Sequence, residues 1–300
     1  MTPITNMAAS VGQRLLNRAR ADKRPFSELL QYYAMERFLY RLSESVFADR
    51  FILKGALLLR IWAAPEFRPT MDIDMLGKTS NEEADILSLF RNILTVPVED
   101  DGLVFDSDSL HLERITENAE YQGVRVRFRG ALERARIVMQ VDIGFGDIIY
   151  PEPEKAHLPT MLDFPAARLF CYSRESTIAE KFEAMVKLGF LNSRMKDFYD
   201  IWLLSRVFHF TGRDLAAAIR LTFERRKTIF PVIIEAFSED FIIEKQTQWS
   251  AFHRRLNQAY IPKEFREIVK HLDVFLTPIL TKLTTGQGTV NNWVAPGPWK

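Results

Sequence analysis

The chain has 300 residues, with 40 Lys and Arg against 39 Asp and Glu, a net charge of +1, and 47% hydrophobic residues. This composition is typical of a globular protein and excludes disordered, collagen-like and small disulfide-stapled chains. Its one cysteine, Cys171, cannot form an internal disulfide, and the five histidines show no metal-ligand spacing. The first thirty residues lack the apolar stretch of a secretion signal, and no apolar run approaches the ~20 residues that span a bilayer. We therefore expect a cytoplasmic protein that does not enter a membrane.

The first half of the sequence predicts helices followed by a sheet. Residues 10–48 carry apolar side chains at every third or fourth position, which is typical of helices. The pattern then predicts, in chain order, a strand at 51–53, a helix at 56–62, a strand at 71–75, a helix at 81–94 capped by Asn81, and strands at 110–115, 124–128 and 136–143. This order of elements predicts an α/β or α+β fold.

The second half predicts helices. Four prolines crowd residues 151–165 and indicate a linker. Helical patterns follow at 177–188, with a capping box from Thr177, and at 193–208, 214–226, 241–260 and 263–283. We therefore expect four parts: an N-terminal helical segment (1–48), a core (49–150), a linker (151–166) and a helical C-terminal domain (167–300).

Three aspartates form the strongest chemical pattern. Residues 71–75 alternate apolar and acidic side chains, so Asp72 and Asp74 lie on one face of a strand. Asp142 lies in another predicted strand between hydrophobic neighbours, where a bound cation would neutralise its charge. If the two strands are neighbours, the carboxylates converge on a volume that can hold two ions, and carboxylate oxygens suit Mg²⁺. The alternative is an exposed edge strand whose acids are solvated.

A phosphate-binding turn is predicted upstream of the acidic strand. Lys54, Gly55 and Ala56 join a strand to the start of a helix, where backbone N–H groups and the helix dipole favour phosphate and glycine permits close approach. Arg68 and Thr70 shortly precede the acids and are further candidates for phosphate contact. A glycine at such a junction is common, and its position one helix before the acids is what makes this one suggestive.

Charged residues in the helical half are candidates as well. Lys181 lies at the margin of an apolar helix face, from which it can look into a cleft or extend along the edge of the buried face. Asp197 and Asp200 begin the next helix, three residues apart, where acids usually serve the helix dipole.

Two basic groups are candidates for binding a nucleic-acid acceptor, because the net charge gives no overall attraction. They are Arg125, Arg127 and Arg129 on one strand face, and the run Arg225 to Lys227 on a helix. The alternative is that these residues are solvated surface.

Taken together, the motifs resemble the AbiEii/AbiGii toxin family, a branch of the DNA polymerase β-like nucleotidyltransferases. The matching segments are FILKGALLLR (51–60), RPTMDIDMLG (68–77), QVDIGFGD (140–147), Glu180-Lys181 and RMKDFYD (194–200). This resemblance implies a nucleotidyltransferase-like mixed sheet with flanking helices, followed by an all-helical C-terminal domain. It also implies Mg²⁺-dependent transfer, with two ions, of a nucleotide from a nucleoside triphosphate, and relatives modify the 3′ end of tRNA.

The resemblance also assigns residues. Gly55 corresponds to the phosphate-loop glycine, Asp72 and Asp74 to metal ligands, and Asp142 to the third acid. Lys181 would hold the triphosphate, and Asp197 or Asp200 would be the acid of the fourth motif, with Asp197 slightly favoured. The sequence departs from the pattern at Ala56, where superfamily members commonly have a hydroxyl or a second glycine, so a side-chain contact to the γ-phosphate is lost.

As a member of this family the protein would be the toxin of a bacterial toxin–antitoxin or abortive-infection pair. Its antitoxin would either bind it or only repress transcription. The competing functions are a nucleotidyltransferase that modifies a protein or small molecule, and a non-catalytic relative that binds nucleotide without turnover.

Overall fold

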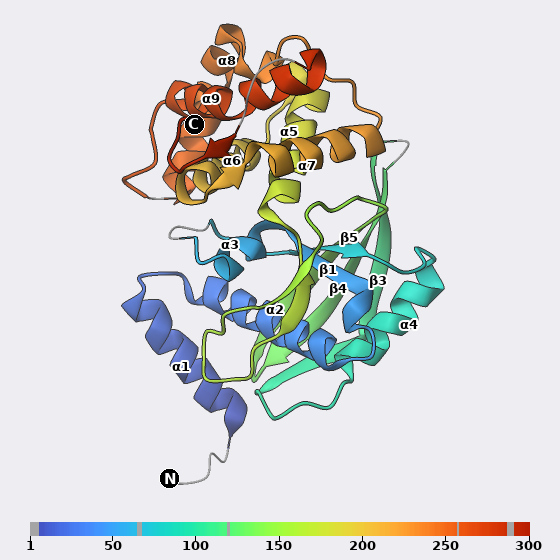
Figure 1. The fold of residues 1–300 in the computed structure, drawn as a ribbon. Helices are drawn as coiled ribbons and strands as arrows, with labels where there is room; N and C mark the ends of the chain where they lie inside the picture. Colours follow the sequence, from blue (N-terminus) through green and yellow to red (C-terminus); the bar gives the residue numbers. More distant parts are fainter. Residues whose placement is uncertain (1–5, 65–67, 119–120, 257, 287–290) are drawn as a thin grey trace. The chain divides into compact units, whose positions relative to one another are not determined.

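The computed structural model describes residues 6–64, 68–118, 121–256, 258–286 and 291–300 (Figure 1). The chain divides into two compact units. The first unit consists of Met1–Gly146 and Glu154–Cys171, and the second of Asp147–Pro153 and Tyr172–Lys300. The chain therefore leaves the first unit, returns to it for one stretch and leaves it again.

The first unit is built on a mixed sheet whose described strands lie in the order β3-β4-β5-β2-β1-β7-β6. The strands are β1 (Phe51–Lys54), β2 (Ile73–Gly77), β3 (Leu103–Asn118), β4 (Tyr121–Leu132), β5 (Ala135–Phe145), β6 (Glu154–His157) and β7 (Arg168–Cys171). β2 runs parallel to β5, and β1 runs parallel to β7, whereas the other neighbouring pairs are antiparallel. This sheet, together with the helices described below, confirms the predicted fold class.

Alternation along β4 and β5 gives this part of the sheet one buried face and one more exposed face, called here the polar face because it carries Asp142 and the arginines of β4. On β5, Met139 and Val141 are fully buried whereas Val138, on the opposite face, is 64% exposed. Helices α2 (Phe26–Glu44) and α4 (Glu83–Leu94) cover the buried face, α2 against β5 and α4 against β3, and α1 (Met7–Ala21) packs on α2 (Figure 1). Rings of Phe38, Phe90 and Phe128 meet between them. The polar face is therefore the part of the sheet on which a functional site is expected.

Several local predictions for the first unit need correction. The expected helix at 56–62 is a 3-10 turn, η2 (Gly55–Leu57), followed by a four-residue helix, α3 (Leu58–Ile61). Helix α4 is preceded by Glu82 as N-cap, without a side-chain cap, so Asn81 does not cap it. A further 3-10 turn, η1 (Ala48–Arg50), leads into β1.

The region expected to be a linker contributes to the sheet. β6 lies inside residues 151–166, and β7 lies at the start of the expected helical domain. β7 pairs with β1 and with β6, so both strands belong to the first unit. Their four-residue lengths, and the exposed Glu154 and Lys155 of β6, leave no periodic pattern to detect.

The second unit is mainly helical. Its helices are α5 (Arg174–Leu188), α6 (Met195–Val207), α7 (Gly212–Arg225), α8 (Glu239–Leu256) and α9 (Phe265–Thr285), joined by the 3-10 turns η3 (Gly189–Leu191) and η4 (Glu235–Phe237). A small pair, β8 (Phe210–Thr211) with β9 (Asn292–Trp293), was not predicted. Ser173, whose hydroxyl accepts from Ser176 N–H, caps α5, so the capping box expected at Thr177 is wrong. None of the described helices combines the length and apolar character needed to cross a bilayer.

Candidate active site

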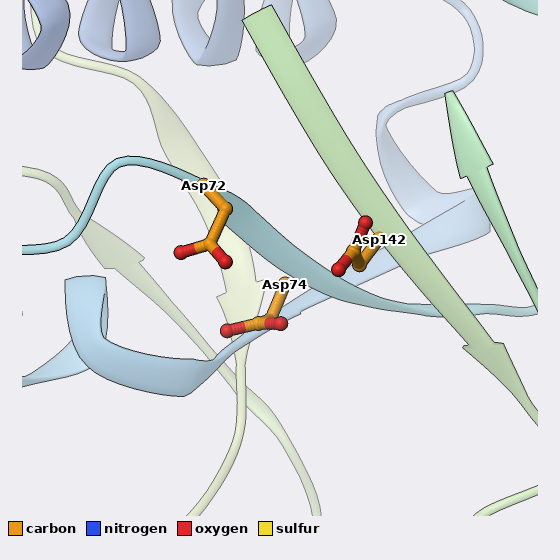
Figure 2. A group of neighbouring side chains, drawn as sticks. All are labelled: Asp72, Asp74 and Asp142. Atoms are coloured by element: carbon orange, nitrogen blue, oxygen red, sulfur yellow. The ribbon is translucent and has the colours of Figure 1, made fainter. Parts of the chain in front are cut away.

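Three carboxylates converge on the polar face of the first unit. In the parallel register of β2 and β5, Asp74 lies opposite Asp142. β2 begins at Ile73, two residues later than the expected strand at 71–75, so Asp72 lies in the bend that leads into it. One oxygen from each carboxylate lies within 4.8 Å of the others, and Figure 2 shows the three groups turned toward a common space. The predicted convergence is confirmed.

The donor set of this cluster fits a hard divalent cation. Oxygens bound to one Mg²⁺ at about 2.1 Å are separated by at most about 4.2 Å, and a pair of ions widens that span. The separation limit of 4.8 Å therefore matches one or two ions. All three aspartates are half-buried, which leaves them accessible to substrate oxygens. Asp72, Asp74 and Asp142 are the residues that would hold Mg²⁺.

Thr70 contacts the first of these acids. Its hydroxyl donates to Asp72 Oδ1 at 2.6 Å, and its backbone N–H donates to the Tyr32 hydroxyl on α2 at 3.1 Å. Thr70 and Tyr32 are both buried. A hydrogen bond from a fixed hydroxyl to a carboxylate restricts the rotation of that carboxylate. Thr70, expected to contact phosphate, thus makes its described side-chain contact with Asp72.

Gln31 of α2 fixes the backbone on which these acids lie. Its buried Nε2 donates to Met71 O at 3.2 Å and to Val138 O at 3.1 Å. One side-chain amide therefore joins the entry of β2 to β5. Sequence reasoning missed this residue, because a glutamine within an apolar helix carries no local sign of its partners.

Gly55 makes room for the second acid. Its φ of +76° lies in the region that favours glycine, and a Cβ built on it would lie 2.8 Å from both Cβ and Cγ of Asp74. Glycine is therefore required here by the backbone and by the carboxylate. Lys54, which precedes it, ends β1 and is paired in register with Asp74.

Arg125 forms a bidentate ion pair with the third acid. Its Nε donates to Asp142 Oδ1 and its Nη2 donates to Asp142 Oδ2, both at 2.8 Å. Gln140 Nε2 also donates to Oδ2, at 3.3 Å. The hydrogen bond to Asp142 and the nearby acids Glu113 and Asp72 outweigh burial and raise the pKa of Arg125 above its ordinary value. Three clustered negative charges are thus offset in part by one fixed guanidinium.

Two other predicted phosphate-binding residues lie near this cluster in sequence. Ala56 is buried in η2, at 5% exposure, and Arg68 is half-buried before Thr70. Because η2 and α3 together form only about two helical turns, the expected contribution of a helix dipole is small. Backbone N–H groups remain as the phosphate donors that this turn can offer.

Lys181, Asp197 and Asp200 form a separate cluster in the second unit. Lys181 Nζ on α5 lies 2.8 Å from Asp197 Oδ1 and 2.8 Å from Asp200 Oδ2 on α6. The exposed fractions of the three side chains are 14%, 6% and 2%, respectively. The structure therefore brings these three predicted residues together, and both aspartates contact the lysine. Their roles toward substrate stay predictions.

Four of the arginines expected to bind an acceptor are paired with acids: Arg125, Arg127, Arg129 and Arg226. Arg226 is mostly buried and contacts Asp147, Glu180 and Glu183 at 2.9–3.4 Å. Burial acts to lower the pKa of Arg226, and the three carboxylates outweigh it and raise that pKa. On β4, Arg127 contacts Glu113 and Arg129 contacts Asp106. Arg226 thus forms an internal ion cluster and is not solvated surface, while contact of the run Arg225 to Lys227 with an acceptor stays a prediction.

A mixed sheet whose parallel strands β2 and β5 present three clustered acids, next to a glycine turn, defines a nucleotidyltransferase type of core. The family model described as "Nucleotidyl transferase AbiEii toxin, Type IV TA system" matches residues 37–271. The chain belongs to this family and is a nucleotidyltransferase. The resemblance drawn from the sequence motifs is confirmed.

Solved structures support the same fold. A candidate nucleotidyltransferase from H. pylori has a TM-score of 0.50 at 16% identity, covering 87% of this chain and 98% of that chain. JHP933 from Helicobacter pylori has a TM-score of 0.50 at 16% identity, covering 86% of this chain and 94% of that chain. A comparison with curated proteins found no match.

Proposed function

We propose that this protein is a Mg²⁺-dependent enzyme that transfers a nucleoside monophosphate from a nucleoside triphosphate to the 3′ end of tRNA. The cluster of Asp72, Asp74 and Asp142, with oxygens within 4.8 Å of one another, carries the chemical part of this proposal. Asp74 on β2, Asp142 on β5 and Asp72 just before β2 provide carboxylate oxygens of the kind that hold divalent ions in phosphoryl transfer.

The proposed reaction is an in-line displacement at the α-phosphorus of the triphosphate. The acceptor hydroxyl oxygen forms a bond to the α-phosphorus, the bond to the bridging oxygen breaks, and pyrophosphate leaves with the electron pair. The hydroxyl proton passes toward Asp142. Bound Mg²⁺ would neutralise charge on the triphosphate and align it for in-line attack. Because the acids are fixed in the sheet, positioning and electrostatics supply most of the barrier lowering.

Phosphate contacts come from the turn and its neighbours. Backbone N–H groups of Lys54, Gly55 and Ala56 would bind phosphate oxygens, with Arg68 as a further donor. Lys181 would hold the triphosphate, with Asp197 and Asp200 fixing its ammonium group, which both contact at 2.8 Å. Each of these roles is part of the proposal.

The choice of tRNA as acceptor, the toxin role in abortive infection and action in the cytoplasm draw their support from the family. An antitoxin partner, either bound or acting only as a repressor, follows from the same membership. The described arginines on β4 are paired with acids, so basic surface does not by itself argue for tRNA.

The test incubates purified protein with Mg²⁺, total tRNA and each of four labelled nucleoside triphosphates. We expect label on an RNA band, release of pyrophosphate and loss of both on adding a chelator. The variant with Asp72→Ala and Asp74→Ala should show no transfer. Retained transfer in that variant would exclude the proposed site, and label on a protein band instead of RNA would exclude tRNA as acceptor. Nucleotide binding without pyrophosphate release would identify a non-catalytic relative.

A further inference from the structure

We propose that Arg125 is a positioning residue that orients Asp142 and sets how tightly the carboxylate cluster binds its divalent ion. This inference rests on the proposed metal-dependent function. It adds to the carboxylate triad a cation that the family motifs do not contain, since β4 lies outside the segments that carry the resemblance.

The contact geometry is that of a fixed fork. Two hydrogen bonds of 2.8 Å join the guanidinium edge to the two carboxylate oxygens. Such a bidentate pair holds the plane of the carboxylate, which a single contact cannot do. Arg125 lies directly opposite Asp142 in the antiparallel β4–β5 register, so the fork is anchored to the same sheet as the acid.

The fork leaves a coordination site open. Each carboxylate oxygen has two lone pairs, and Arg125 uses one on each oxygen. Glu113 on β3 and Gln140 on β5 contact the same group of side chains: Glu113 contacts Arg125 at 3.7 Å and Gln140 donates to Asp142 at 3.3 Å. The guanidinium therefore has acids on two sides, and Asp142 keeps one lone pair, on Oδ1, for a metal ion.

The charge of Arg125 weakens metal binding, whereas its bidentate geometry holds Asp142 in place for transfer. A cation at hydrogen-bond distance from a ligand oxygen repels a divalent ion bound at the same carboxylate. It also neutralises part of the repulsion among the three acids when no ion is bound. Removing the charge should therefore tighten metal binding, whereas removing the fork should misplace Asp142 and slow transfer.

Two variants separate these effects. Arg125→Gln removes both charge and fork, so we expect Mn²⁺ to bind about tenfold more tightly and transfer at saturating metal to slow by about tenfold or more. Arg125→Lys keeps the charge without the fork, so Mn²⁺ affinity should stay within about twofold of wild type while transfer slows. Arg136→Gln is the matched control, because Arg136 lies on the same face of β5, six residues from Asp142, beyond the range of strong electrostatic interaction.

The full chain is titrated with Mn²⁺ alone, and binding is measured by calorimetry or from the spin-resonance signal of free Mn²⁺. Tighter binding together with slower transfer in Arg125→Gln supports the inference, because a general loss of folding would weaken both. Unchanged or weaker Mn²⁺ binding in a folded Arg125→Gln protein would overturn it. If that variant does not fold, Arg125→Lys decides, and transfer at the wild-type rate in Arg125→Lys overturns the inference.

The outcome also separates this inference from the proposed function. Wild-type protein that binds no Mn²⁺ would refute the metal site and the inference together. Wild-type protein that binds Mn²⁺ but modifies no tRNA would refute the proposed acceptor alone, since the affinities of the Arg125 variants would still test the positioning role.

Discussion

The carboxylate of Asp74 occupies the space that a side chain on Gly55 would need. With its φ of +76°, Gly55 places the backbone so close to Asp74 that an added Cβ would lie 2.8 Å from two atoms of that acid. The turn and the acidic strand are therefore fitted to each other, and a change in one must displace the other.

Replacing Gly55 with alanine should damage the site more than the fold. We expect a loss of about 1–3 kcal/mol in the free energy of unfolding from backbone strain, and a fall in transfer of at least about tenfold as Asp74 moves. Urea unfolding and labelled-nucleotide transfer measure the two effects. Gly12→Ala is the control, because its nearest contact, Leu132, is 4.0 Å away and alanine suits the interior of α1. Wild-type transfer by Gly55→Ala would show that this fit is not needed.

Removing the hydroxyl of Thr70 should affect the rate of transfer more than the free energy of unfolding. Thr70→Val keeps the shape and removes the 2.6 Å hydrogen bond to Asp72, so we expect transfer to fall by about tenfold or more, as for loss of a hydrogen bond to a charged group. Thr70→Ser keeps the hydroxyl and should retain most of the rate. The comparison is made by steady-state transfer kinetics, and equal rates for the two variants would contradict this role.

Lys181 should be needed for folding as well as for any contact with phosphate. Lys181→Met leaves Asp197 and Asp200 buried without their shared cation, and we expect a loss of about 3–5 kcal/mol in the free energy of unfolding. Adding Asp197→Asn and Asp200→Asn should recover part of that loss. Lys187→Met, at an exposed position of the same helix, is the control. Urea denaturation decides, and a stability equal to that of the control would show that the cluster is not strongly coupled.

Glu36 should make stability depend on pH. Burial raises the pKa of this carboxyl on α2 to about 7, against the backbone hydrogen bond from Met161 and the positive charges of Arg37, Arg60 and Arg18, which lower it. Between pH 4.5 and 7 the unfolded chain releases this proton and the folded chain keeps it. The contribution of protonated Glu36 to the free energy of unfolding is therefore complete below pH 4.5. About 3 kcal/mol of it is lost as pH rises to about 7.

Glu36→Gln tests this dependence, because an amide does not titrate. Its advantage over wild type in the free energy of unfolding should increase from pH 4.5 to 7 and then level off. Parallel curves of stability against pH for the two proteins would contradict the assignment of this titration to Glu36.

The acidic cluster could be predicted because alternation is a local property of a strand. Alternation in residues 71–75 predicts Asp72 and Asp74 on one face. Alternation in residues 137–143 predicts Asp142 on the face opposite the apolar side chains of its own strand. Which strands are neighbours is decided by the whole sheet. From sequence, the convergence of the three acids could therefore be predicted only on the assumption that β2 and β5 lie side by side. The structure confirms that assumption.

The partners of these acids could not be predicted in the same way. The turn at Glu133 and Arg134 pairs Leu132 with Ala135. Counting seven residues from the turn along each strand then pairs Arg125 with Asp142. Recognising the two-residue turn at Glu133 and Arg134 in the sequence would have predicted that Arg125 pairs with Asp142. No comparable signal joins Gln31 to Met71 and Val138, since tertiary packing alone brings α2 to the sheet.

The return of the chain for β6 and β7 determines which fragments of this protein are worth expressing. A piece cut at residue 150 keeps all three aspartates, yet it strips β1 of its parallel neighbour and leaves an open, apolar sheet edge, the kind of surface on which chains aggregate. A fragment meant to carry the acidic cluster should therefore extend through Cys171, the end of the first unit, to remain soluble.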